Sequence, residues 1–136
     1  NIKINMVPLT WANMVARGSK VETSPQMMAI FATPVSTDPD AVAMQYHPSS
    51  HGAYYGVHYV DDDKLTAMID KARFTPSWND RKPIYEQIQQ RIVDLQPEIF
   101  GMMRERRIAY RDWVKGYSYS PVRMTEEVDF YGLHIE

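Results

Sequence analysis

The sequence contains no cysteine among its 136 residues. This absence excludes disulfides, thiolate metal sites and cysteine nucleophiles, and it leaves the redox compartment open. No apolar run approaches the roughly 18 residues of a membrane-spanning helix, so we expect no such helix. The formal net charge is only −2. Without a clustered basic face, nothing in the charge favours a nucleic-acid partner.

The length and the apolar content of 44% suit one domain with a single core. The chain opens on "NIKINMV", without an initiating Met or a signal peptide, and this stretch already alternates like a strand. We therefore expect a fragment of a longer protein, in which case the missing signal says nothing about secretion.

The first thirty residues carry the pattern of a βαβ unit. Residues 2–6 alternate apolar and polar, which predicts a half-buried strand. Thr10 is a plausible N-cap for a helix that ends at Gly18. Residues 27–31 form a continuous apolar run, typical of a strand covered on both faces. The two strands of such a unit are parallel.

The loop "FATPVSTDPD", residues 31–40, leaves the carboxyl end of the second predicted strand. Loops at that end of parallel strands tend to line ligand crevices. Pro34 and Pro39 stiffen the loop, and we expect Asp38 to cap the turn that follows. The residues predicted to contact a ligand are Phe31, Thr33, Val35 and Ser36.

Helical signals dominate the middle of the chain. We expect a short helical turn near residues 41–46, and then a helix that starts at the acids of residues 61–63. A second helix is predicted to be capped by Asp80, to tolerate Pro83 in its first turn and to end at Pro97. Their apolar faces comprise Leu65, Met68, Ile69 and Ala72 in the first, and Ile84, Tyr85, Ile88, Ile92 and Leu95 in the second. Residues 98–120 then alternate, which predicts strands or extended segments.

Histidines and serines crowd the loop before the first of these helices. His47, His51 and His58 could in principle bind a metal, but their spacing favours surface histidines in a polar loop, so we predict no metal site. Ser50 and His51, with the acids that follow, invite a hydrolase hypothesis. A catalytic triad is defined by three-dimensional roles rather than proximity in sequence, and no G-x-S-x-G motif is present.

Aromatic and basic side chains form two further clusters. Four tyrosines, at positions 46, 54, 55 and 59, suit either a ligand wall or a lid over the core, and at least one should be structural. Of these, Tyr54 and Tyr55 are added to the predicted ligand contacts. Arginines at positions 104, 106, 107 and 111 are interleaved with acids, which indicates a solvated face rather than a nucleic-acid site.

Several segments in this order resemble the C-terminal part of the family 5 extracellular solute-binding proteins, the receptors of peptide, nickel and related ABC importers. The segments are "INMVPLTWANMVARGSK", "MMAIFATPVSTDPD", "VDDDKLTAMIDKAR", "DRKPIYEQIQQRIVDLQPEIF" and "WVKGYSYSPV". The resemblance implies an α/β fold: one lobe of a type II periplasmic-binding-protein-like architecture, with the βαβ unit, two further amphipathic helices and C-terminal extended segments. Residues 1–100 would form the lobe, and residues 101–136 would return to pack on it or on a second lobe.

The resemblance also implies a departure in the ligand loop. Peptide-binding members carry G-W-x-x-D-Y-x-D-P there, with the Trp as a cleft wall and the first Asp paired with the peptide α-amino group. Alignment on Asp38 places Ala32 at the Trp position, Val35 at that Asp position and Ser36 at the Tyr position. A buried cation without its carboxylate is costly, so we expect a less cationic ligand, such as a sugar, an opine-like or modified amino acid, or another polar metabolite.

The sequence thus predicts the substrate-binding component of an ABC importer, without enzymatic activity and without a cofactor. Its expected partners are a small polar or peptide-like ligand and the permease subunits, and its expected location is periplasmic or otherwise extracytoplasmic. Two alternatives stay open: a small hydrolase that uses Ser50 or His51, and an interaction module that uses the tyrosine-rich loop.

Overall fold

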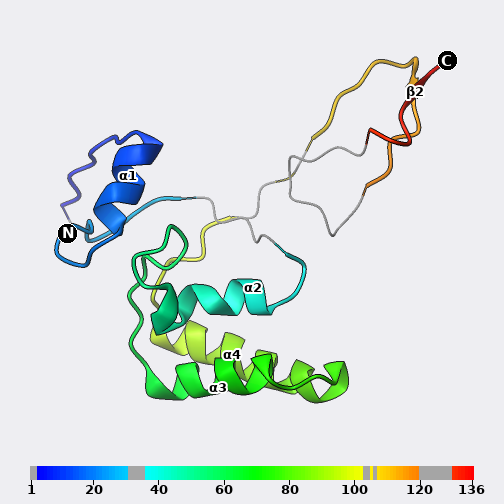
Figure 1. The fold of residues 1–136 in the computed structure, drawn as a ribbon. Helices are drawn as coiled ribbons and strands as arrows, with labels where there is room; N and C mark the ends of the chain where they lie inside the picture. Colours follow the sequence, from blue (N-terminus) through cyan, green and yellow to red (C-terminus); the bar gives the residue numbers. More distant parts are fainter. Residues whose placement is uncertain (1–2, 31–35, 103–104, 106, 120–129) are drawn as a thin grey trace.

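The computed structural model describes residues 3–30, 36–102, 105, 107–119 and 130–136. Short helices follow one another along the chain, and one small strand pair lies at its end (Figure 1). In chain order the elements are α1 (Trp11–Gly18), α2 (Asp40–Ala43), the 3₁₀ turns η1 (Met44–Tyr46) and η2 (Pro48–Ser50), α3 (Asp63–Arg73), α4 (Trp78–Leu95), β1 (Val114–Lys115) and β2 (His134–Ile135).

The core lies where α2 and η1 pack over the α3–α4 pair (Figure 1). Leu65 and Ile69 of α3 are fully buried, and Ile88 of α4 is 1% exposed. Both predicted apolar faces are confirmed: their members are buried, except that Met68 and Leu95 are partly buried against the cluster. The complete core comprises Ala43, Tyr46, Leu65, Ile69, Ala72, Ile84, Tyr85, Ile88 and Ile92.

Local signals at the ends of α3 and α4 explain their lengths. Asp62 caps α3, because its side chain accepts the backbone N–H of Leu65 at 2.7 Å. Helix α4 ends as Gln96 turns into the left-handed region at φ 49°. The predicted start of α4 is wrong by three residues: the cap is Ser77 rather than Asp80 and the helix begins at Trp78, so Asp80 lies in the first turn and Pro83 lies inside the helix. Acids in a first turn still favour the helix dipole.

Helix α1 is confirmed from its Thr10 cap to Gly18. It is anchored through Gly18, the buried residue of the helix, whose carbonyl accepts the Tyr59 hydroxyl at 2.7 Å. A Cβ at Gly18 would lie 2.9 Å from Val57 Cγ1, so a larger residue there would require the Val57 side chain to shift.

The two strands predicted beside α1 are absent from the described residues. Residues 3–10 and 27–30 contain no strand, and Met6 is 87% exposed. A strand needs a neighbour for its backbone groups, and no partner strand lies beside either segment in the described chain. The predicted parallel βαβ unit is therefore not formed by the described residues, and the solute-binding lobe as a fold class stays a prediction.

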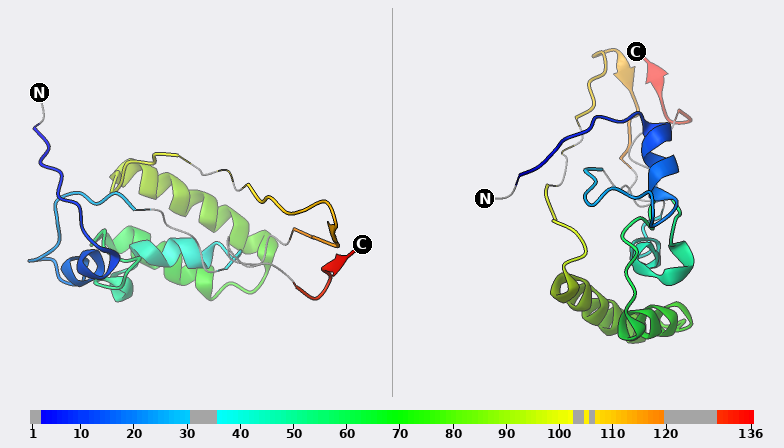
Figure 2. Two further views of the ribbon diagram at one scale, coloured as in Figure 1. Left: turned by 90° about the horizontal axis from the view of Figure 1, so that it is seen from above. Right: turned by 90° about the vertical axis from the view of Figure 1, so that its left-hand side faces the viewer.

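The C-terminal strands form the sheet of the described chain. Strand β1 pairs antiparallel with β2, with Val114 opposite Ile135 and Lys115 opposite His134. This strand pair lies away from the α3–α4 pair, as two views agree (Figures 1 and 2). Most of the described part of residues 98–120 is irregular, so the predicted extended segments contribute one strand of two residues.

Candidate functional site

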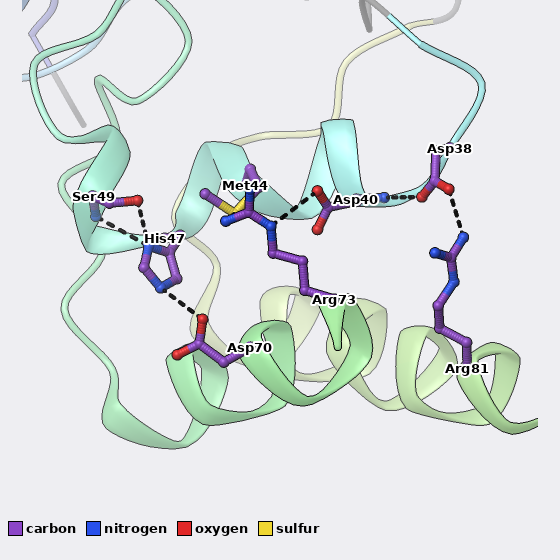
Figure 3. Close-up of polar contacts among 8 residues, drawn as sticks. All are labelled: Asp38, Asp40, Met44, His47, Ser49, Asp70, Arg73 and Arg81. Atoms are coloured by element: carbon purple, nitrogen blue, oxygen red, sulfur yellow. Dashed lines mark hydrogen bonds and ion pairs between the residues drawn. The ribbon is translucent and has the colours of Figure 1, made fainter. Parts of the chain in front are cut away.

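A charged pocket of about 210 Å³ lies where the loop of residues 36–39 enters α2. Two further elements complete it: the end of α3 and the start of α4 each contribute an arginine (Figure 3). Its lining residues are Ser36, Asp38, Asp40, Ala41, Arg73 and Arg81. The pocket therefore contains the described end of the loop that the sequence predicted to contact a ligand.

Asp38 connects the loop to two helices. Its Oδ1 accepts the backbone N–H of Asp40 at 2.9 Å, which confirms the predicted capping role. Its Oδ2 accepts from the guanidinium of Arg81 at 2.5 Å. The Asp40 N–H is the largest influence on the Asp38 carboxyl; together with the Arg81 hydrogen bond and charge it lowers the pKa of Asp38 despite an opposing effect of burial. Asp38 is therefore charged at neutral pH.

The two arginines are held in different ways. Arg81 lies over the rings of Trp78 and Tyr85, with its Cζ 5.6 and 5.4 Å from their centroids. Arg73 places Nε 3.5 Å from Asp40 Oδ2 (Figure 3). The four charged side chains of the pocket, Asp38, Asp40, Arg73 and Arg81, sum to zero formal charge.

Three buried polar atoms in this region have no hydrogen-bond partner among the described residues: Asp40 Oδ1, Arg81 Nε and Tyr85 Oη. Buried polar atoms in folded proteins are nearly always hydrogen-bonded to protein or to water. Burial raises the pKa of Tyr85, and the charge of Asp40 adds to this effect, so its hydroxyl stays neutral. Beside the pocket there are thus a buried acceptor and a buried donor without a protein partner among the described residues.

The structure separates the predicted ligand contacts. Ser36 lines the pocket. Phe31, Thr33 and Val35 lie outside the described residues. Tyr54 and Tyr55 do not line the pocket: Tyr54 packs edge-on against Trp11 of α1, with ring centroids 4.9 Å apart, and Tyr55 packs against Tyr54 at 5.9 Å.

Sequence reasoning missed Arg73 and Arg81 as pocket residues. Both are separated by more than thirty positions from the loop they meet, and each also fits an ordinary place on a helix. The sequence does show that their charge is opposite to that of Asp38 and Asp40. Opposite charge alone does not indicate which residues pair.

The prediction of surface histidines is wrong, because each of the three is partly buried and bonded. His58 Nε2 lies 2.8 Å from Glu98 Oε2, and the Tyr46 hydroxyl donates to the other Glu98 oxygen at 2.7 Å. His51 Nε2 lies 2.9 Å from the carbonyl oxygen of Val60. Glu98 follows α4, so the partner of His58 comes from a distant part of the sequence. Within the described residues, no three His, Asp or Glu side chains are placed to hold a metal ion.

The Ser50–His51 hypothesis finds no matching geometry in the described contacts. Ser50 is buried, at 7% exposure, and the described hydrogen bond of the His51 ring goes to Val60. Tyr46, at 4% exposure, belongs to the core, which confirms that at least one tyrosine is structural.

In comparisons with family models, with curated proteins and with solved structures, the chain has no match. The family resemblance therefore stays a prediction. Across the part of the chain that the structure describes, no helix combines the length and the apolar character needed to cross a bilayer.

Proposed function

We propose that this chain is part of an extracytoplasmic solute-binding protein, located in the periplasm or outside the cell. It captures a small polar or peptide-like solute in a cleft without transforming it, and delivers the solute to the permease subunits of an ABC importer. The observation that carries the proposal is the pocket of Ser36, Asp38 and Arg81, with its unpartnered buried donor and acceptor.

The pocket chemistry favours a neutral or zwitterionic ligand. Arg81 Nε–H and Asp40 Oδ1 are both buried and unpartnered among the described residues. A solute that displaces the side chains covering them would place a carboxylate or hydroxyl oxygen against the Nε–H and an N–H or O–H against Oδ1. The carboxylate of Asp38 is already engaged by the Asp40 N–H and by Arg81, so it is not available as the dedicated partner of a ligand ammonium.

Closure around the ligand would supply most of the affinity. In a two-lobed receptor the ligand is enclosed by walls from both sides of a hinged cleft. A single wall leaves the solute largely solvated, so we expect the present chain to bind with a Kd of about 1 mM or weaker.

A titration followed by nuclear magnetic resonance tests the proposal. The probes are N-acetyl-L-alanine, L-alanyl-L-alanine and sucrose, and the observed signals are the Arg81 Nε–H and the backbone amides of Ser36 and Ala41. We expect at least one probe to shift these signals saturably and to remain chemically unchanged. The variant R81K keeps a cation for Asp38 but loses the Nε–H, so it should abolish the shifts.

Arg17 supplies the matched control, because it lines a separate hollow of about 350 Å³ beside α1. The variant R17K should leave the titration unaltered. Saturable shifts that persist in R81K, shifts that map to Arg17, the absence of saturation with all three probes, or conversion of a probe into product would each refute the proposal.

A further inference from the structure

His47 joins a serine and an aspartate that the solute pocket does not use (Figure 3). The residue stands between η1 and η2, and its Nδ1 lies 2.7 Å from Ser49 Oγ. The same Nδ1 accepts the backbone N–H of Ser49 at 3.1 Å. On the other side of the ring, Nε2 lies 3.5 Å from Asp70 Oδ1 of α3.

These contacts fix the proton positions. A nitrogen that accepts a backbone N–H carries no proton, so Nδ1 presents its lone pair and the neutral ring carries its proton on Nε2. The Ser49 hydroxyl must then be the donor to Nδ1. Nε2 lies 3.5 Å from Asp70 Oδ1 without a hydrogen bond, and the negative charge of Asp70 favours the tautomer with its proton on Nε2.

The arrangement meets the first part of the geometric criterion for an activated nucleophile, a hydroxyl within hydrogen-bond reach of a base, and a carboxylate lies 3.5 Å from the far side of the ring. Ser49 is exposed, whereas only 15% of the His47 side chain is exposed. Ser50, the neighbouring serine, is buried and unavailable.

We propose that Ser49 is a nucleophile that takes an acyl group from an activated ester, with His47 as the general base and Asp70 as a positioning residue. Ser49 Oγ attacks the carbonyl carbon of the ester while its proton passes to the single lone pair of His47 Nδ1, and the hydrogen bond from the Ser49 backbone N–H to that nitrogen breaks. The bond between the carbonyl carbon and the leaving oxygen then breaks, and the leaving group departs as its anion or takes the proton from His47. The products are an ester on Ser49 and a free alcohol or phenol.

The backbone around Ser49 limits this chemistry to acyl capture. The N–H groups of Ser50 and His51 already donate to the carbonyls of His47 and Pro48. Neither of them is free to stabilise an oxyanion, which is a major contribution to rapid acyl transfer. Both the formation and the hydrolysis of the Ser49 ester are therefore slow compared with acyl transfer at a site that has an oxyanion hole.

Acetylation by p-nitrophenyl acetate, located by peptide mass spectrometry, tests the proposal on the intact chain. We expect Ser49 to react about 100-fold faster than Ser19 or Ser36, since general-base assistance is worth about 10²–10⁴-fold. These two serines are exposed internal controls: Ser19 Oγ donates to the Ala16 carbonyl and Ser36 Oγ accepts the Asp38 N–H.

Two variants separate nucleophilic activation from a structural role of His47 as the cap of η2. H47N keeps a side-chain oxygen that can cap the turn but removes the base, so the advantage of Ser49 over Ser19 should disappear. D70N should lower the acetylation rate of Ser49 and alter its pH dependence. D70E, which keeps a carboxylate at this position, should retain both the rate and the pH dependence in part. Equal rates at Ser49 and Ser19, an undiminished rate in folded H47N, or a pH profile unchanged by D70N would overturn the proposal.

Discussion

Replacement of Asp38 separates the two roles that its carboxylate plays at the pocket. D38A removes both the acceptor for the Asp40 N–H and the ion pair with Arg81. Loss of a capping acceptor costs about 1 kcal/mol. Loss of the ion pair with Arg81 costs between about 0 and 1 kcal/mol, because 42% of the Asp38 side chain is exposed and solvent screens the charges. We therefore expect D38A to lower the free energy of unfolding by about 1–2 kcal/mol.

D38N should cost less, because the amide oxygen still accepts the Asp40 N–H and only the charge is lost. Urea unfolding followed by circular dichroism measures both variants. D61N, at an exposed acid before α3, serves as the control and should leave stability unchanged.

The same residue predicts a pH dependence with a definite sign. The pKa of Asp38 is lowered in the folded chain, mainly by the Asp40 N–H and then by Arg81, so the unfolded chain binds the proton more tightly. The stabilising contribution is complete above the unfolded pKa, near about 4, and is lost as the pH falls through the folded pKa. The stability difference between wild type and D38N should narrow in that range. Equal costs of D38N and D38A, or a difference that stays constant with pH, would refute this reasoning.

Three further predictions concern the core and the loop above it. L65A should lower the free energy of unfolding by about 2–5 kcal/mol, because Leu65 is completely buried; a cost below 1 kcal/mol would contradict the core assignment. Y46F should cost about 1 kcal/mol by removing the donor to Glu98. Burial, and then Glu98, raise the pKa of Tyr46 in the folded chain. The Tyr46 hydroxyl therefore stabilises the fold below the unfolded pKa, near about 10, and this stabilisation is lost as the pH rises above that value. A stability difference between wild type and Y46F that is unchanged at alkaline pH would disprove this pH dependence. G56A should destabilise the chain by about 1–3 kcal/mol or more, because its Cβ would lie 1.8 Å from the Ser50 carbonyl oxygen; wild-type stability in the thermal melt would show that the loop is placed differently.

The helices were predictable because their signals are local. Spacing alone placed Leu65 and Ile69 on one buried face, and Thr10 and Gly18 marked the ends of α1. The strands were not, since an alternating segment becomes a strand only where a second segment pairs with it. Residues 2–6 alternate, but their described part, residues 3–6, has no partner strand in the described chain, whereas Val114 pairs with Ile135 from a distant stretch.

The pocket was predictable in part. The sequence indicated the loop and the capping role of Asp38 through local turn chemistry, and Ser36 lies in the pocket. The sequence pattern predicted that loop at the end of a parallel strand, and the described residues contain no such strand. The charge pairing with Arg81 now supports the site instead, and such a contact between distant positions depends on how α2 packs on α3 and α4.

A crystal structure of the chain soaked with N-acetyl-L-alanine tests most directly whether the charged pocket receives a polar solute. We predict that the ligand lies in the pocket, with a carboxylate oxygen within hydrogen-bond distance of Arg81 Nε and its amide N–H directed to Asp40 Oδ1. A ligand bound elsewhere, or a soaked crystal in which Arg81 Nε and Asp40 Oδ1 are bonded to each other or to other side chains, would contradict this prediction.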